Sequence, residues 1–195
     1  MNARTIDIER TTRETEIRGK LDLDGSGQVE IATGLGFLDH MFHALAFHAR
    51  WDLRLTCRGD VAVDDHHTVE DCALALGEAI DRILGDRRGI ARFGHAYAPL
   101  DEALARVVVD LSGRPCAVVD LGLRRDALGG VACENLDHAF RSLGTAMRAA
   151  LHVDVLRGDN DHHRVEAAFK ACALALRAAL APAAGGVAST KGVLA

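Results

Sequence analysis

The chain has 195 residues, of which 49% are hydrophobic and 26% charged, so it can bury a substantial core without a disulfide scaffold. Its formal net charge is -5 and its arginines are spread along the whole length, which argues against nucleic acid or an anionic membrane as a partner. The N-terminus is polar and no later segment reaches membrane-spanning length, so we expect a cytoplasmic protein. The five cysteines show no C-x-x-C spacing, which predicts reduced thiols that pack in the interior.

The first part of the chain alternates polar and apolar residues in short segments and then changes to helical spacing. Asp-Gly-Ser-Gly at residues 24–27 predicts a turn between two of the alternating segments. The predicted elements are strands at residues 4–10, 14–23 and 28–33, a helix at 37–50, a strand at 51–57 and a helix at 66–84.

The second part of the chain follows the same order. Its predicted elements are strands near residues 93–98, 104–111 and 116–122, a helix at 134–150, a strand at 151–156 and a helix at 162–180. Each part therefore reads β-β-β-α-β-α, which favours an α+β fold in which a sheet covers paired helices on one face. The tail over residues 182–195, rich in Gly and Ala, is expected to be loop-like.

Two motifs recur along the chain. Leu-Asp-His at residues 38–40 returns at residues 136–138, and Asp-His-His-x-Val-Glu at residues 65–70 returns at residues 161–166. The order and the near-constant offset predict a tandem duplication. We expect half-repeats over residues 1–90 and 91–195, combined in one compact domain.

The repeated motifs carry residues that can bind metal ions. On a helix, residues three and four apart share a face, so each glutamate lies beside both histidines of its own motif. Adjacent histidines diverge by about 100° around the helix axis, so the two members of a pair should serve different ions. With one histidine from each Leu-Asp-His motif, the set divides into two sites of three His and one Glu. The predicted ligands are His40, His66, His67, Glu70, His138, His162, His163 and Glu166.

Nitrogen and oxygen donors without a thiolate suit manganese, iron, nickel or zinc. A six-coordinate ion with four protein ligands keeps two positions open, which favours catalysis over a structural clamp. Which histidine of each pair shares an ion with the neighbouring glutamate stays open at this point.

A histidine taken singly is more often an ordinary core or surface residue, and we interpret His43, His48, His95 and His152, each taken by itself, in that way. The Ala- and Leu-rich stretches at residues 73–83 and 171–180 predict core. A duplication that is merely structural is the alternative explanation of the doubled motifs, but two motifs recurring in the same order disfavour it.

At these motifs the sequence resembles the imidazoleglycerol-phosphate dehydratase family, from about Arg4 to Leu194. Val69 stands where Asn is common in the family and Thr190 where Ser is common, and neither changes a predicted ligand. The family includes fusions to a phosphatase domain, for which this chain has no room, so a monofunctional enzyme is expected. The matching segments are residues 36–41, 63–70, 92–94, 99–103, 110–115, 158–170 and 191–194.

The resemblance implies a hydro-lyase of L-histidine biosynthesis. The reaction converts D-erythro-imidazole glycerol phosphate to imidazole acetol phosphate with loss of water, using two Mn²⁺ ions per active site. The proton to be removed is not next to a carbonyl, and a substrate imidazole held by metal can form an imidazolate that expels the hydroxyl through a diazafulvene. The resemblance also implies that Glu14, an exposed strand residue by its pattern, is the general acid/base.

The resemblance further implies two four-stranded sheets that enclose a four-helix layer, and a homo-oligomer of 24 subunits with metal sites between subunits. For any one arginine or lysine, solvated surface charge would be the ordinary interpretation, and only the motif context predicts contact with the substrate. The predicted substrate-binding residues are His48, Arg92, Arg114, Lys170, Ser189 and Lys191.

Two rival functions use similar residues. A dinuclear metal hydrolase would act on esters or amides through a metal-generated hydroxide. A metal-binding assembly or storage protein would saturate its ligands without open positions and would give Glu14 no role.

Overall fold

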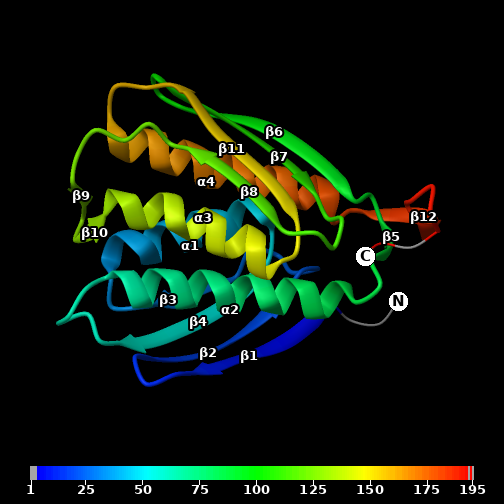
Figure 1. Ribbon diagram of the computed structural model, residues 1–195, viewed down its shortest axis with the longest axis horizontal. Helices are drawn as coiled ribbons and strands as arrows, with labels where there is room; N and C mark the ends of the chain where they lie inside the picture. Colours follow the sequence, from blue (N-terminus) through cyan, green and yellow to red (C-terminus); the bar gives the residue numbers. More distant parts are fainter. Residues whose placement is uncertain (1–3, 193, 195) are drawn as a thin grey trace.

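The computed structural model describes residues 4–192 and Leu194, and its main part consists of two four-stranded sheets with helices between them (Figure 1). The first sheet has the strand order β1-β2-β4-β3. In it β3 runs parallel to β4, and the other neighbours are antiparallel. Its strands are β1 (Thr5–Thr11), β2 (Thr15–Asp22), β3 (Val29–Ala32) and β4 (Asp52–Gly59).

The second sheet repeats this topology with the order β6-β7-β11-β8. Here β8 runs parallel to β11, and the remaining neighbours are antiparallel. The predicted α+β class is therefore confirmed, and the strands of both four-stranded sheets keep the predicted β-β-β-α-β-α order relative to the helices. The strands are β6 (Phe93–Leu100), β7 (Ala103–Asp110), β8 (Cys116–Asp120) and β11 (Ala150–Arg157).

Helices form the layer between the sheets (Figure 1). They are α1 (Gly36–Ala49), α2 (His66–Leu84), α3 (Cys133–Ala146) and α4 (Asp161–Ala179). Helix α2 packs on β1 and β2, and α4 packs on β6 and β7. The helices also pair across the two parts of the chain, because α1 packs on α4 and α2 packs on α3. These cross-pairs bring residues of the first part beside residues of the second.

The core lies where the inward faces of the sheets meet the helices. Alternation along β2 and β4 buries Ile17, Leu21 and Leu55 completely, as expected for strands covered on one face. Between α2 and α3, a Cβ added to Gly77 would lie 2.7 Å from the Cβ of Ala146. The glycine therefore allows these two helices their close approach.

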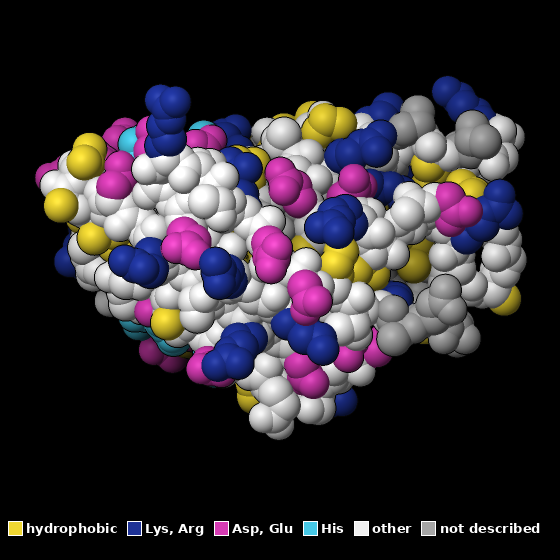
Figure 2. Space-filling model, turned by 90° about the horizontal axis from the view of Figure 1, so that it is seen from below, with side chains coloured by type: hydrophobic (Ala, Val, Ile, Leu, Met, Phe, Trp, Pro, Cys, Tyr) yellow, Lys and Arg dark blue, Asp and Glu magenta, His cyan; other side chains and the backbone are white. Residues whose placement is uncertain are grey.

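The face of the first sheet that points away from the helices is charged. Basic and acidic side chains are interspersed over the face seen in Figure 2, and hydrophobic ones are scattered. Exposed ion pairs of this sheet include Arg18 with Glu16 at 2.8 Å and Arg54 with Glu30 at 3.1 Å. None of the described helices is long and apolar enough to span a membrane.

The structure corrects the prediction for the tail. Residues expected to be loop-like contain strand β12 (Pro182–Val187), which pairs antiparallel with β5 (Arg88–Ile90). Gly and Ala carry no alternating pattern, so the strand depends on its partner and could not be read from composition. The rest of the described tail, residues 188–192 and Leu194, lies outside helices and strands.

Two further differences lie around α3. The helix predicted to reach residue 150 ends at Ala146, and Arg148 has a left-handed backbone (φ 54°) before β11 begins. Ahead of α3, β9 (Ala127–Leu128) and β10 (Val131–Ala132) form a hairpin that was not predicted. Its turn is Gly129–Gly130, both with positive φ, which glycine adopts without strain.

The cysteines are free, as predicted, and four of the five are buried. Cys116, at the start of β8, is exposed and does not serve as a packing residue.

Candidate metal centres

Among the described residues, the helix pairing assembles two groups of possible metal ligands. The first, called the α1–α4 cluster, consists of His40, His162 and Glu166, whose ligand atoms all lie within 4.8 Å of one another. The Nε2 atom of His40 lies 3.2 Å from Glu166 Oε2, and Nε2 of His162 lies 3.1 Å from the same oxygen. Two imidazole nitrogens from different halves of the chain thus converge on one carboxylate oxygen.

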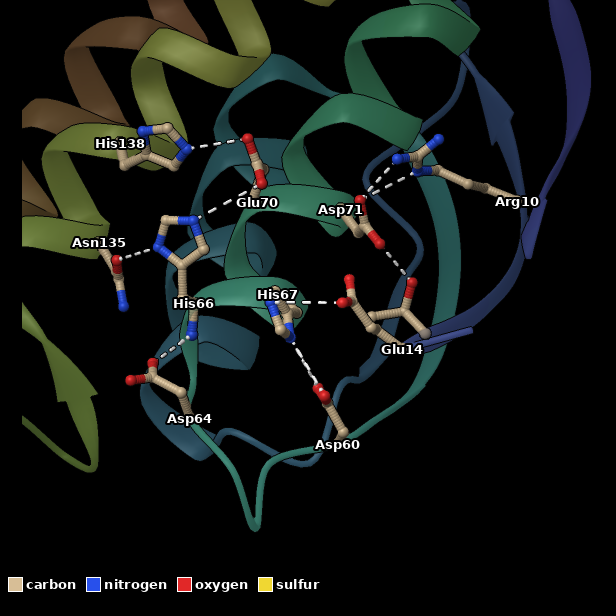
Figure 3. Close-up of polar contacts among 11 residues, drawn as sticks. Arg10, Glu14, Asp60, Asp64, His66, His67, Glu70, Asp71, Asn135 and His138 are labelled. Carbon is tan, nitrogen blue, oxygen red and sulfur yellow. Dashed lines mark hydrogen bonds and ion pairs between the residues drawn. The ribbon is translucent and has the colours of Figure 1, made fainter. Parts of the chain in front are cut away.

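The second group, called the α2–α3 cluster, consists of His66, Glu70 and His138 (Figure 3). Nε2 of His138 lies 3.0 Å from Glu70 Oε1, and Nε2 of His66 lies 3.6 Å from Glu70 Oε2. His66 donates from Nδ1 to Asn135 Oδ1 at 2.9 Å. This hydrogen bond keeps the proton on Nδ1 and leaves Nε2 available as a ligand.

Both clusters follow one design. Each joins the i and i+4 residues of one His-His-x-x-Glu motif to the histidine of a Leu-Asp-His motif from the other half. The structure thereby settles which histidine of each pair accompanies the glutamate: it is the first, His66 beside Glu70 and His162 beside Glu166.

The second histidine of each pair turns away, as the 100° divergence predicts. The His66 and His67 rings are 6.0 Å apart and nearly perpendicular at 79°, and those of His162 and His163 are 6.2 Å apart at 87°. His67 and His163 therefore lie outside the clusters. Within the described chain each cluster has two histidines and one glutamate, not the predicted three histidines.

The outlying His67 lies between two carboxylates (Figure 3). Its Nδ1 donates to Asp60 Oδ2 at 3.1 Å, and its Nε2 is 3.7 Å from Glu14 Oε1. The hydrogen bond with Asp60 raises the pKa of His67. Glu14 lies in the turn before β2 and not in the strand itself, with a half-exposed side chain.

The outlying His163 has a similar surrounding. Its Nδ1 donates to Glu102 Oε2 at 2.8 Å, and its Nε2 is 3.9 Å from Asp101 Oδ2. Hydrogen bonds from the backbone N–H of Asn160 and from His163 lower the pKa of the Glu102 carboxyl to about 2.

Glu166 carries a negative charge although it is largely buried. Burial alone would raise its pKa, but hydrogen bonds from Lys170 and His40 outweigh that effect and lower it to about 2. A charged carboxylate with neutral imidazoles is the donor set that a divalent transition-metal ion prefers. Because two Nε2 atoms face one carboxylate in each cluster, the residues present fit such an ion.

A separate cavity of about 630 Å³ contains four of the six predicted substrate-binding residues. Arg92 in this cavity is already oriented, since its Nε and Nη2 donate to Asp110 at 2.7 and 3.0 Å. The four residues are Arg92, Arg114, Ser189 and Lys191.

The other two predicted substrate-binding residues lie elsewhere. Lys170 Nζ is 2.8 Å from Glu166 Oε1, so it belongs to the α1–α4 cluster. His48 is half-buried on α1, and burial and then the charge of Lys170 lower its pKa. The structure does not bring either residue into the cavity of Arg92.

Three side chains that support histidines were not predicted from the sequence, namely Asn135, Asp60 and Glu102. Asn135 lies three residues before His138, a helical spacing that could have singled it out. Glu102 falls in a family-matching segment, but nothing in the sequence places it against His163. Asp60 carries no signal beyond its position shortly before the His-His pair.

The fold and the site define a class of α+β proteins with histidine–glutamate clusters at the crossings of paired helices. Comparison narrows that class to one family. The model of the imidazoleglycerol-phosphate dehydratase family matches residues 33–176, and the chain belongs to this family.

Individual relatives agree with the family assignment. The imidazoleglycerol-phosphate dehydratase of Candida glabrata is 52% identical over 207 residues, covering 96% of this chain and 99% of its own. That of Phytophthora nicotianae is 57% identical over 193 residues, and this chain spans 43% of its length.

Solved structures of the family share the fold. The crystal structure of IGPD from Pyrococcus furiosus in complex with (S)-C348 has a TM-score of 0.84 and 41% identity, covering 96% of this chain and 100% of its own. Imidazoleglycerol-phosphate dehydratase from Staphylococcus aureus has a TM-score of 0.79 and 34% identity, covering 91% and 99%.

Proposed function

We propose that this chain is a hydro-lyase that converts D-erythro-imidazole glycerol phosphate to imidazole acetol phosphate in L-histidine biosynthesis. The observation that carries the proposal is the pairing of each His-His-x-x-Glu motif with a histidine of the other half, in a chain that belongs to the dehydratase family. The two histidine–glutamate clusters of the described residues suit a substrate whose imidazole offers two nitrogens.

The clusters hold Mn²⁺ in this proposal, two ions per active site. A bound ion supplies Lewis acidity and orients the substrate imidazole. His40, His162 and Glu166 hold one ion. His66, Glu70 and His138 hold the other. Lys170 forms an ion pair with Oε1 of Glu166, so that Oε2 faces the two histidines of the α1–α4 cluster.

Glu14 is the general acid/base in this proposal. Its carboxylate is half-exposed and lies 3.7 Å from Nε2 of His67, so it can face a substrate held beside that histidine. Glu14 removes the carbon-bound proton of the substrate, which is only weakly acidic when the imidazole ring alone activates it. It returns a proton when the enol becomes the ketone.

The cavity of Arg92 and Arg114 binds the substrate phosphate in this proposal. Guanidinium groups form paired hydrogen bonds with phosphate oxygens, and Ser189 and Lys191 add donors from the tail. Asp110 holds the Arg92 fork in a fixed orientation. Lys170 and His48 serve the imidazole end of the substrate, since both lie by the α1–α4 cluster.

The active enzyme is a cytoplasmic homo-oligomer of 24 subunits in this proposal, with metal sites between subunits. His67 and His163 support it, because both are directed away from the clusters of their own chain. Each would supply the third histidine to a site that is completed by a neighbouring copy.

A product assay tests the proposal. Protein loaded with Mn²⁺ is incubated with imidazole glycerol phosphate, and imidazole acetol phosphate and inorganic phosphate are both quantified. We expect the ketone and no release of phosphate. Phosphate release without the ketone would favour the hydrolase, and the absence of both products from fully metallated protein would refute the dehydratase.

A further inference from the structure

Glu102 divides its two oxygens between two tasks. It lies in the β6–β7 turn, and its Oε1 accepts hydrogen bonds from the backbone N–H groups of Asp159 at 3.0 Å and Asn160 at 2.9 Å. Its Oε2 accepts from Nδ1 of His163 at 2.8 Å. Oε1 thus stabilises the backbone just before α4, and Oε2 orients the His163 ring.

Asp60 holds the other outlying histidine in a different way. Both of its oxygens lie near Nδ1 of His67, at 3.2 and 3.1 Å. Among the described residues the Asp60 side chain has no other hydrogen-bond partner.

The two halves of the chain differ in the glutamate that precedes the second strand of each sheet. Glu14 lies directly before β2, as Glu102 lies directly before β7. Glu102 is occupied by three hydrogen bonds, whereas the Glu14 carboxylate, 3.7 Å from His67, accepts none from the described residues. In the first half Asp60 supports the histidine, so Glu14 stays free for chemistry.

We propose that Glu102 and Asp60 are positioning residues that keep the proton of His163 and His67 on Nδ1, so that Nε2 of each histidine is free to bind a metal ion. The inference rests on the proposed role of His67 and His163 as ligands. Its physical basis is that a carboxylate only accepts hydrogen bonds, and a neutral imidazole binds metal through the nitrogen without a proton.

The geometry predicts opposite behaviour for two amide variants. In Glu102→Gln, the amide oxygen stays with Asp159 and Asn160, because turning it around would lose two hydrogen bonds to keep one. The amide N–H₂ group then donates to Nδ1 of His163, so the imidazole carries its proton on Nε2. A protonated Nε2 cannot bind a metal ion. In Asp60→Asn the amide is free to rotate, so its oxygen still accepts from His67.

Metal titration of the full chain tests this prediction. Mn²⁺ binding is measured against a competing chelator in wild type, Glu102→Gln and Asp60→Asn, with no substrate present. We expect Glu102→Gln to weaken one of the two sites about tenfold or more, and Asp60→Asn to change affinity by less than about threefold. Equal affinity of Glu102→Gln and wild type would overturn the proposal.

A third variant separates positioning from stability. Glu102→Ala loses the backbone hydrogen bonds but presents no opposing N–H₂ group to His163. We expect it to melt at a lower temperature than Glu102→Gln and yet to bind Mn²⁺ more tightly. If the order of melting temperatures matched the order of affinities, Glu102 would be a structural residue only.

A measurement on the wild type does not depend on whether a variant folds. The ¹⁵N resonances of the metal-free protein, labelled at histidine, report which ring nitrogen is protonated. We expect His163 with its proton on Nδ1, and a proton on Nε2 would overturn the proposal. Wild type that binds Mn²⁺ but forms no ketone would refute the dehydratase function and leave this inference intact.

Discussion

Each His-His-x-x-Glu motif sends its two histidines to different surroundings. The first faces its own glutamate across one helical turn, as His66 faces Glu70 at 3.6 Å. The second donates to a carboxylate outside the helix, as His163 does to Glu102 at 2.8 Å. In the proposed arrangement, one short motif therefore contributes to two metal sites, because neighbouring helical positions diverge by about 100°.

His40→Ala tests the α1–α4 cluster. His40 is the only residue that α1 contributes to this cluster among the described residues, so its loss should weaken one Mn²⁺ site about tenfold or more and leave the other unchanged. Bound manganese per chain is the measurement. His43→Ala on the same helix is the control, since His43 is exposed and stacks on Phe47. Two tightly bound ions in His40→Ala would exclude His40 as a ligand.

Glu14→Gln separates chemistry from metal binding. The amide keeps the size of the side chain but cannot take a proton, so we expect kcat to fall by about 10²–10⁴-fold with manganese content unchanged. Glu16→Gln is the matched control, because Glu16 pairs with Arg18 on the first sheet. A Glu14→Gln variant with wild-type kcat would remove Glu14 from the mechanism.

At the scale of elements, the site depends on which helices pair. Helix α1 packs on α4 and α2 packs on α3, so each cluster combines residues of both halves. The order of elements followed from hydrophobic periodicity, which is a local signal. Strand β12 and the β9–β10 hairpin did not, because short Gly- and Ala-rich segments show no periodicity and form only against a partner strand.

Gly77→Ala tests the close packing of α2 on α3. The added methyl group would meet both Ala146 and the carbonyl of Leu143 at 2.7 Å, so we expect a loss of about 1–3 kcal/mol in the free energy of unfolding. Urea denaturation measures it. Gly36→Ala is the control, since its Cβ would meet nothing within 4 Å. An unchanged midpoint in Gly77→Ala would mean that the interface between α2 and α3 accommodates the added methyl group.

At the scale of the whole molecule, the two parts share one strand topology but differ in their details. We interpret this as a duplication with half-repeats at residues 1–90 and 91–195. The recurring motifs predicted six histidines and two glutamates as metal ligands. They could not predict Asp60 or Glu102, because tertiary packing alone brings these side chains to the histidines.

Chelation tests the proposed assembly. If His67 and His163 complete sites on neighbouring copies, removal of manganese should convert the 24-subunit particle to smaller species, and added Mn²⁺ should restore it. Native mass measurement follows both steps. A 24-subunit particle that persists without metal would place the interfaces elsewhere.

Turnover measured as a function of bound manganese tests the proposed metal-dependent dehydration. Metal-free protein is titrated with Mn²⁺ while imidazole acetol phosphate and bound metal are quantified together. We expect no product without metal, and a rate that rises until two ions are bound per chain. Full turnover in metal-free protein, or none with both sites filled, would contradict it.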